Sequence, residues 1–175
     1  GAVVIVIDDD WAAARDWSSR IKVMEGLIDQ AERDDRAIFL LRTTWTPEDD
    51  WALDKPLTTT EARSVIKAMV PRPTATRLDV LVEALGGAGL PSPADVVWLS
   101  NGVLDPGEAE MTELLRRLGG LMIVADDTSG PRILIPPSSS GRSIEVEAVR
   151  FSTGVAEPIA IRAIAPDGRV LAHAT

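Results

Sequence analysis

Four short apolar runs, at 2–7, 37–41, 95–99 and 121–125, are separated by longer segments with a different periodicity. Continuous apolar runs of this length are typical of strands that are buried on both faces. In the intervening segments apolar residues recur every three or four positions, as in an amphipathic helix. This alternation predicts an α/β fold: a doubly wound, mostly parallel sheet with helices on both faces and right-handed crossovers.

Local signals predict where the helices begin and end. Asp10 is expected to cap a first helix that ends in the charged run 32–36. A capping-box pattern at Thr58 and Glu61 opens a second helix. Two further helices are expected from about 78 to 85 and from 106 to 118, the last with Asp105 as its N-cap. The stretch 43–57 is interpreted as a loop with weak strand character near 51–53.

The periodicity changes from 3.6 to 2 in the last part of the chain. Apolar residues alternate with polar ones in two segments there, and the turn pattern 166–168 joins two strands. The alternating residues are Ile144, Val146 and Ala148 in the first segment and Ile159, Ile161 and Ala163 in the second. We therefore predict an α/β domain at 1–135 and an antiparallel β-strand module at 136–175, interpreted as truncated.

Polar clusters follow two of the predicted strands. Asp8, Asp9 and Asp10 come after the first run, and 100–102 (Ser-Asn-Gly) follows the third. Ligands of open parallel sheets bind beyond the carboxyl ends of the strands, so these clusters mark the expected place for a site.

Composition excludes several classes of function. The net charge of -9 argues against a nucleic-acid partner, since phosphate binding needs clustered basic residues. The chain has no Cys and a single His, His173, which excludes thiolate catalysis and makes a His-based metal cluster improbable.

Three segments, 7–13 after the first strand, 75–78 at the start of a middle helix and 98–102 after a central strand, resemble the von Willebrand factor type A domain. The resemblance covers residues 2–135. That family binds a cation at a metal-ion-dependent adhesion site, with an Asp-x-Ser-x-Ser motif, a Thr from the middle helix and a later Asp. The resemblance implies a corresponding metal site formed by Asp8, Asp10, Thr76 and Asn101.

Two positions depart from the family pattern. Ala12 stands where the second Ser would be and offers no ligand atom, and Asn101 replaces the last Asp with a neutral oxygen. The site is therefore interpreted as degenerate, with Mg²⁺ as the only cofactor considered. The alternative, which we favour, is that Asp8 and Asp10 cap the first helix and Asn101 closes a turn.

The segments 9–17, 42–44, 69–73 and 98–102 are similar to a degenerate type A domain of bacterial, especially alphaproteobacterial, membrane-anchored proteins. Those proteins carry an aerotolerance-regulator-type double transmembrane segment at the N-terminus. The resemblance implies a soluble region of an inner-membrane protein, on either side of the membrane. The chain opens with Gly1 directly before a strand, so we expect an excised piece whose parent meets the membrane through other segments.

An enzyme is the alternative. Asp8, Asp10, Ser100 and the pair Asp126-Asp127 also resemble the haloacid-dehalogenase-like phosphohydrolases. In that family the first Asp is the nucleophile, the second is a general acid/base, the Ser binds phosphate and the late Asp pair binds Mg²⁺. The family also needs a late Lys, but none follows Lys67 here, which leaves Arg116 or Arg117 as poor substitutes.

The sequence thus favours a non-enzymatic protein–protein interaction or scaffold domain with no catalytic and no cofactor-binding residues, although it does not decide the question of an enzyme. Trp11, Trp45 and Trp51 fall in or beside loops near the strand ends, where an exposed Trp can anchor a protein partner. Burial is the commoner outcome for such residues. Trp17 and Trp98 are expected in the core.

Overall fold

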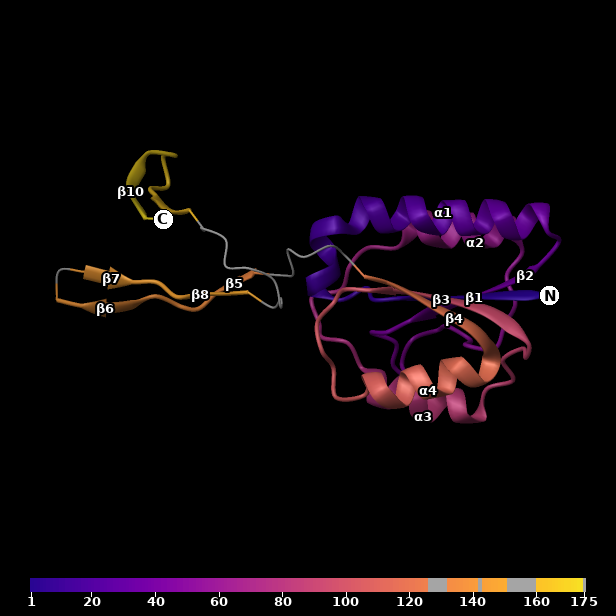
Figure 1. The fold of residues 1–175 in the computed structure, drawn as a ribbon. Helices are drawn as coiled ribbons and strands as arrows, with labels where there is room; N and C mark the ends of the chain where they lie inside the picture. The colour runs from indigo at the N-terminus through magenta and orange to yellow at the C-terminus, as the bar shows by residue number, and fades with distance from the viewer. Residues whose placement is uncertain (126–131, 142, 151–159, 175) are drawn as a thin grey trace.

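A computed structural model describes residues 1–125, 132–141, 143–150 and 160–174. Its centre is an all-parallel, four-stranded sheet in the order β2-β1-β3-β4. The strands are β1 (Ala2–Ile7), β2 (Ala37–Arg42), β3 (Ala94–Ser100) and β4 (Gly119–Ala125). Figure 1 shows α1 (Trp17–Arg33) and α2 (Thr59–Ala68) on one face, and α3 (Leu78–Gly87) and α4 (Glu108–Leu118) on the other. The predicted α/β fold is confirmed.

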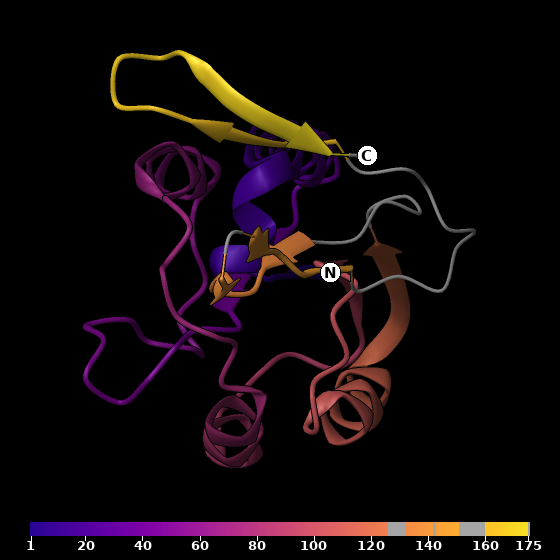
Figure 2. The ribbon, with the colours of Figure 1, turned by 90° about the vertical axis from the view of Figure 1, so that its left-hand side faces the viewer.

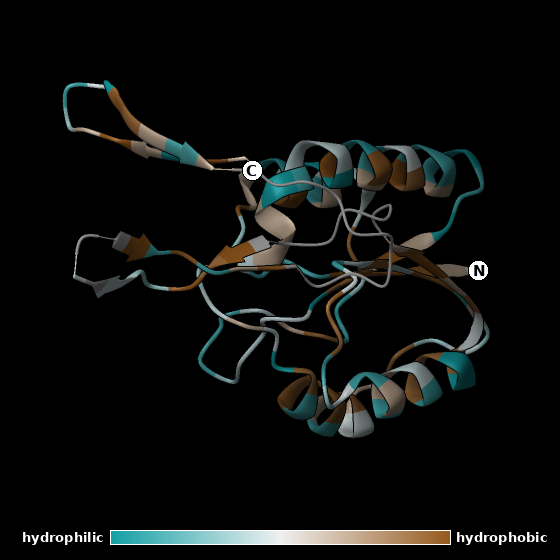
Figure 3. Ribbon diagram, turned by 60° about the vertical axis from the view of Figure 1, so that its left-hand side comes forward, coloured by the Kyte–Doolittle hydropathy of each residue, from teal (hydrophilic) through white to brown (hydrophobic). Residues whose placement is uncertain are grey.

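The central strand β1 shows why its sequence is apolar at every position. All six of its residues are buried. Val4 and Val6 pack with α3 and α4, whereas Val3, Ile5 and Ile7 pack with α1 and α2. Successive side chains of a strand point to opposite faces, so a strand covered on both faces has no polar side. Figure 3 shows the matching pattern on the helices, whose apolar residues are turned toward the sheet.

Three helix starts can be compared with the prediction. Asp10 does act as an N-cap, but for a 3-10 helix, η1 (Trp11–Asp16), that leads into α1. The capping box of α2 is confirmed, with reciprocal bonds between Thr58 and Glu61. The expected N-cap at Asp105 is wrong, because α4 begins only at Glu108. Asp105 Oδ1 instead accepts from the backbone N–H of Gly107 at 2.8 Å and closes the turn before the helix.

The loop 43–57 covers the outer edge of β2. It was interpreted as a loop with weak strand character near 51–53, and the structure has a loop there, with one antiparallel bridge between Ile38 and Leu57. The Leu57 N–H donates to Ile38 O at 2.7 Å. The indole of Trp51 donates to Leu40 O at 3.0 Å, so a side chain takes the place of a strand's backbone at this edge.

The C-terminal strands form three separate antiparallel pairs. β5 (Arg132–Leu134) pairs with β8 (Ala148–Arg150), β6 (Ser138–Ser140) with β7 (Ser143–Glu145), and β9 (Ile161–Ile164) with β10 (Val170–Ala174). The antiparallel β segment and the turn at 166–168 are confirmed. Ile159 lies outside the described residues, and the boundary at residue 135 stays a prediction. Within the described parts of the chain, no helix has both the length and the apolar character that crossing a membrane requires.

Candidate functional site

The carboxyl ends of β1, β2 and β3 meet at one edge of the sheet. Ile7 of β1 is in register with Arg42 of β2 on one side and with Leu99 of β3 on the other. The next residue, Asp8, donates its backbone N–H to Leu99 O at 3.0 Å. The parallel register therefore brings the Asp run and the segment 100–102 together, as the sequence predicted.

Asp8 is 3 % exposed, and both of its carboxylate oxygens accept hydrogen bonds from the protein. The indole Nε1 of Trp98 donates to Oδ1 at 2.9 Å, and the backbone N–H of Asn101 donates to Oδ2 at 2.7 Å. Burial raises the pKa of Asp8 to about 6, against the opposing effect of these hydrogen bonds and one from Thr43. Asp8 is thus a buried acid whose lone pairs are already directed at internal donors.

Asp10 and Asn101 extend this arrangement. Oδ1 of Asp10 accepts from the backbone N–H of Ala13 at 3.2 Å and from Nδ2 of Asn101 at 3.0 Å. The side-chain oxygen of Asn101 accepts in turn from the N–H of Val103 at 2.7 Å. Asn101 therefore ties both carboxylates to the loop that follows β3.

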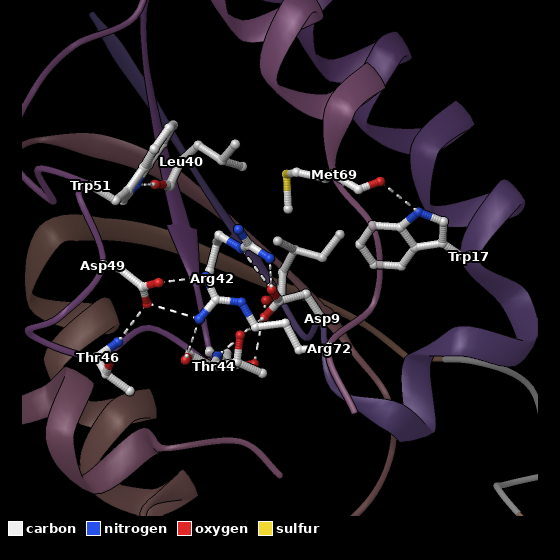
Figure 4. Close-up of polar contacts among 12 residues, drawn as sticks. Asp9, Trp17, Leu40, Arg42, Thr44, Thr46, Asp49, Trp51, Met69 and Arg72 are labelled. Carbon is white, nitrogen blue, oxygen red and sulfur yellow. Dashed lines mark hydrogen bonds and ion pairs between the residues drawn. The ribbon is translucent and has the colours of Figure 1, made fainter. Parts of the chain in front are cut away.

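Asp9, to which the sequence analysis assigned no role, is fully buried between two donors (Figure 4). Its Oδ2 receives Nε of Arg42 at 2.6 Å and pairs with a second guanidinium nitrogen of Arg42 at 2.5 Å. Its Oδ1 accepts from the N–H of Thr44 at 3.1 Å and from the Thr44 hydroxyl at 2.8 Å. The signal in the sequence was the Arg at the end of the neighbouring strand, which parallel pairing places beside the Asp run.

A second ion pair lies next to Asp9. The guanidinium of Arg72 donates two hydrogen bonds to the Asp49 carboxylate, of 2.8 and 2.6 Å. It also donates to Thr44 O at 3.3 Å. The backbone N–H of Arg72 donates to Asp9 O at 2.6 Å. Arg72 holds the pKa of Asp49 below its ordinary value. Asp49, in the acidic run 48–50, thus clamps the loop after β2 to the segment after α2.

Thr76, the fourth residue of the implied metal site, has a different partner. Its hydroxyl donates to Oδ2 of Asp105 at 2.5 Å, which links the start of α3 to the turn before α4. The structure therefore brings Asp8, Asp10 and Asn101 together through hydrogen bonds, whereas the Thr76 hydroxyl is bonded to Asp105. Within the described ranges, no three acidic, His or Cys side chains form a group suited to a metal ion.

The residues of the phosphohydrolase alternative are also placed. Ser100 accepts from the N–H of Gly102 through its hydroxyl at 3.1 Å, and the guanidinium of Arg20 donates to Leu99 O and Ser100 O at 2.9 Å each. Arg116 and Arg117 are in the last turn of α4, directly before β4 begins. They lie at the amino edge of the sheet, so they cannot replace a Lys beside Asp8. Asp126 and Asp127 lie outside the described residues.

The five Trp residues differ in how far they are exposed to solvent. Trp98 is buried as expected, and Trp17 is half-buried with its indole donating to Met69 O at 3.3 Å. Trp45 and Trp51 are also half-buried, with their indole N–H groups bonded to backbone oxygens. Trp11 is 38 % exposed.

Trp11 belongs to a set of exposed apolar residues, the carboxyl-edge rim, formed with Val70 and Leu104. Val70 is 67 % exposed and Leu104 is 88 % exposed. Trp11 follows β1, and Leu104 follows β3. Val70 leads into the segment 71–74, whose Thr74 O accepts from the Trp11 N–H at 3.3 Å. Three loops thus present apolar side chains to solvent around the buried carboxylates.

Comparisons with known proteins leave the activity open. No family model and no curated protein matches the sequence. Among solved structures, the chain is similar to proximal thread matrix protein 1 (PTMP1) from the mussel byssus, with a TM-score of 0.48 and 15 % sequence identity. The match covers 71 % of this chain and 36 % of that one, so the chain spans about a third of that protein's length.

Proposed function

We propose that this chain is a non-enzymatic protein-interaction or scaffold domain of the von Willebrand factor A type whose metal site has been lost. In this proposal it belongs to a bacterial protein that is anchored in the membrane by other segments. A partner protein binds over the carboxyl-edge rim.

The observation that carries this proposal is the environment of Asp8. A carboxylate that binds Mg²⁺ must direct an oxygen lone pair at the ion, within a near-octahedral set of oxygen ligands. Here an indole N–H and a backbone N–H occupy the two oxygens of Asp8. Asp10 accepts two further N–H groups, and Ala12 has no ligand atom. With these hydrogen bonds in place, the oxygen atoms of Asp8 and Asp10 do not form a ligand set that fits Mg²⁺. The contacts support a structural role for both carboxylates.

The same contacts weigh against a phosphohydrolase. A nucleophilic carboxylate needs an exposed oxygen, whereas Asp8 is 3 % exposed and bonded at both oxygens. Asp10 is occupied as the cap of η1, and Arg116 and Arg117 are at the far edge of the sheet. Of the described cations at this edge, Arg20 is bound to the Leu99 and Ser100 carbonyl oxygens, and Arg42 is bound to Asp9.

The carboxyl-edge rim supports the interaction role. Trp is enriched among the residues that dominate binding energy at protein interfaces, and Trp11 is held by a capped helix start on one side and by Thr74 on the other. A rigid aromatic side chain loses little entropy on binding. Leu104 and Val70 add apolar surface on neighbouring loops.

Two solution experiments test the loss of the metal site and of catalysis. Calorimetric titration of the native chain with Mg²⁺ and Mn²⁺ is expected to give no saturable heat; tight binding that disappears in Asp8→Ala would overturn the degenerate-site proposal. Turnover of p-nitrophenyl phosphate with Mg²⁺ is expected to stay at background. Turnover that is lost in Asp8→Asn would instead establish the enzyme alternative.

The interaction role is tested by quantitative affinity capture from a bacterial membrane extract with three baits. These are the native chain, the double variant Trp11→Ala/Leu104→Ser, and the control Val23→Ser, which changes an exposed residue of α1. Proteins that the native and control baits retain and the rim variant loses support the proposal. Equal retention by all three baits argues against binding at the rim.

A further inference from the structure

Within the described residues, β4 is an edge strand without the usual protection. It ends the sheet, and Met122, Ile123 and Val124 are 55, 44 and 37 % exposed. Its seven residues, 119–125, include no charged residue and no Pro. Its pairing with β3 is continuous from Gly119 to Ala125, so no bulge twists the edge away. Charge, Pro, bulges and covering loops are the devices that keep natural edge strands from pairing with another chain.

The opposite edge of the same sheet is protected. The loop 43–57 covers β2 with the Leu57 bridge and with the indole of Trp51. Figure 2, which looks along the strands, shows β4 as the outermost strand on the other side. Among the described residues, no strand pairs with the outer edge of β4.

A groove runs beside β4 on the face that carries α1. Its volume is about 310 Å³, and its apolar lining includes Leu27, Val97 and Met122. On the other face, α4 contacts both β3 and β4. One face of the edge strand is therefore covered by a helix, and the other borders an open groove that is also lined by Gln30 and by the Arg36–Asp95 ion pair.

We propose that β4 pairs antiparallel with β4 of a second copy of this chain, which joins the two sheets into one. A two-fold axis normal to the sheet would pass at Met122 and place it opposite Met122 of the partner subunit. Leu121 would then lie opposite Ile123 of the partner subunit. Such an interface is isologous and closes at the dimer. The proposal is independent of the function assigned to the carboxyl edge.

Charge complementarity on α4 favours a second copy as the occupant. The two-fold axis leaves both α4 helices on one face, antiparallel to each other and two strand spacings apart, which is roughly 10 Å and within the range for packed helices. The first turn of α4 carries Glu108 and Glu110, and its last turn carries Arg116 and Arg117. The antiparallel arrangement thus sets the acidic turn of each helix against the basic turn of the other.

The net charge of the chain does not prevent this contact. β4 is neutral along its whole length, and α4, with three Glu and two Arg, carries only -1 of the total of -9.

Sedimentation equilibrium of the full chain tests the proposal. The native chain is expected to associate to twice its mass of 18.8 kDa and no further. Met122→Lys places two ammonium groups face to face on the axis and is expected to weaken the dimer at least tenfold. The matched control Val23→Lys adds the same charge on α1, away from β4, and is expected to leave the dimer intact. Circular dichroism checks that both variants are folded.

Cross-linking gives an independent readout, because the chain has no Cys. Residues directly opposite in an antiparallel pair have Cβ atoms about 4.5–5.5 Å apart, close enough for a disulfide after a small adjustment. Met122→Cys is expected to form a disulfide-linked dimer on mild oxidation, whereas Leu104→Cys, which leaves β4 unchanged, is expected to form no disulfide-linked dimer under the same conditions. A native chain that sediments as a monomer up to its solubility limit, or a Met122→Lys variant that dimerises as the control does, would overturn the proposal.

Discussion

The indole of Trp98 donates its N–H to Oδ1 of Asp8 at 2.9 Å, at the carboxyl edge of the sheet. Both residues are buried, Trp98 at 2 % and Asp8 at 3 % exposure. The indole of Trp98 thereby occupies a position from which the Asp8 carboxylate could otherwise bind a ligand. This contact explains how an acidic residue at a ligand-binding edge serves as part of the core.

Replacing Trp98 by Phe should destabilise the chain by about 1–3 kcal/mol, because a buried carboxylate oxygen loses its donor. The substitution also removes part of a buried ring, which adds a packing loss to that of the hydrogen bond. The matched control is Trp17→Phe, which removes a longer indole bond of 3.3 Å to Met69 O at a half-buried site. Urea unfolding followed by circular dichroism measures both. Equal losses for the two variants would show that the Asp8 contact carries no special weight.

Stability should respond to the titration of Asp8. Its pKa is about 6 in the folded chain and 3.8 is its ordinary value, so the folded state holds the proton more tightly. The stabilisation from this group is fully present below pH 3.8 and is lost as the pH rises through 6. It amounts to up to about 3 kcal/mol.

The measurement is the free energy of unfolding of the native chain minus that of Asp8→Asn, from pH 4 to pH 8. The difference should grow in favour of the native chain as the pH falls, and subtraction removes the opposite trend of Asp49, whose pKa is lowered. A flat difference would mean that Asp8 titrates in the same way in the folded and unfolded chain.

Removing Arg42 should be among the most destabilising single changes. Arg42→Met leaves the charge of Asp9 buried, with the two bonds from Thr44 and the neighbouring Arg72 charge to compensate it. Loss of one partner of a buried pair costs about 3–5 kcal/mol. The control is Arg63→Met, whose partners Asp29 and Glu32 are exposed, and where we expect a loss below about 1 kcal/mol. Thermal and urea unfolding give the comparison.

If the chain is a type A domain with a degenerate site, as proposed, introducing the residues of the type A motif should create a response to Mg²⁺. Asn101→Asp replaces the amide that donates to Asp10 with a third carboxylate, so the variant should be destabilised without metal. With Ala12→Ser added, Mg²⁺ is expected to raise the melting temperature of the double variant and to leave the native chain unchanged. Ca²⁺ and Na⁺ at matched ionic strength serve as controls. An equal response of native chain and double variant to Mg²⁺ would contradict the degenerate site.

Most of the fold could be predicted from the sequence, because buried strands and helices have characteristic patterns of apolar residues. A strand covered on both faces, such as β1, is apolar throughout. The start of α2 is marked in the sequence by the capping box of Thr58 and Glu61. The local details that the sequence did not decide are those in which one residue has two conformational alternatives of similar energy. Asp105 can cap a helix or close a turn, and Trp51 can enter a strand or bond an edge through its indole.

The sequence by itself determined the layers, the parallel sheet and the edge at which Asp8, Asp10 and Asn101 meet, because these follow from hydrophobic period and strand direction. Only the tertiary structure decided what those residues do there. Trp98 and Arg42 are remote from the Asp run in sequence, yet their N–H groups reach it once β3 and β2 pair with β1. Whether a carboxylate is available to a ligand depends on which donors surround it, and that is settled by packing across strands rather than by its neighbours in the chain.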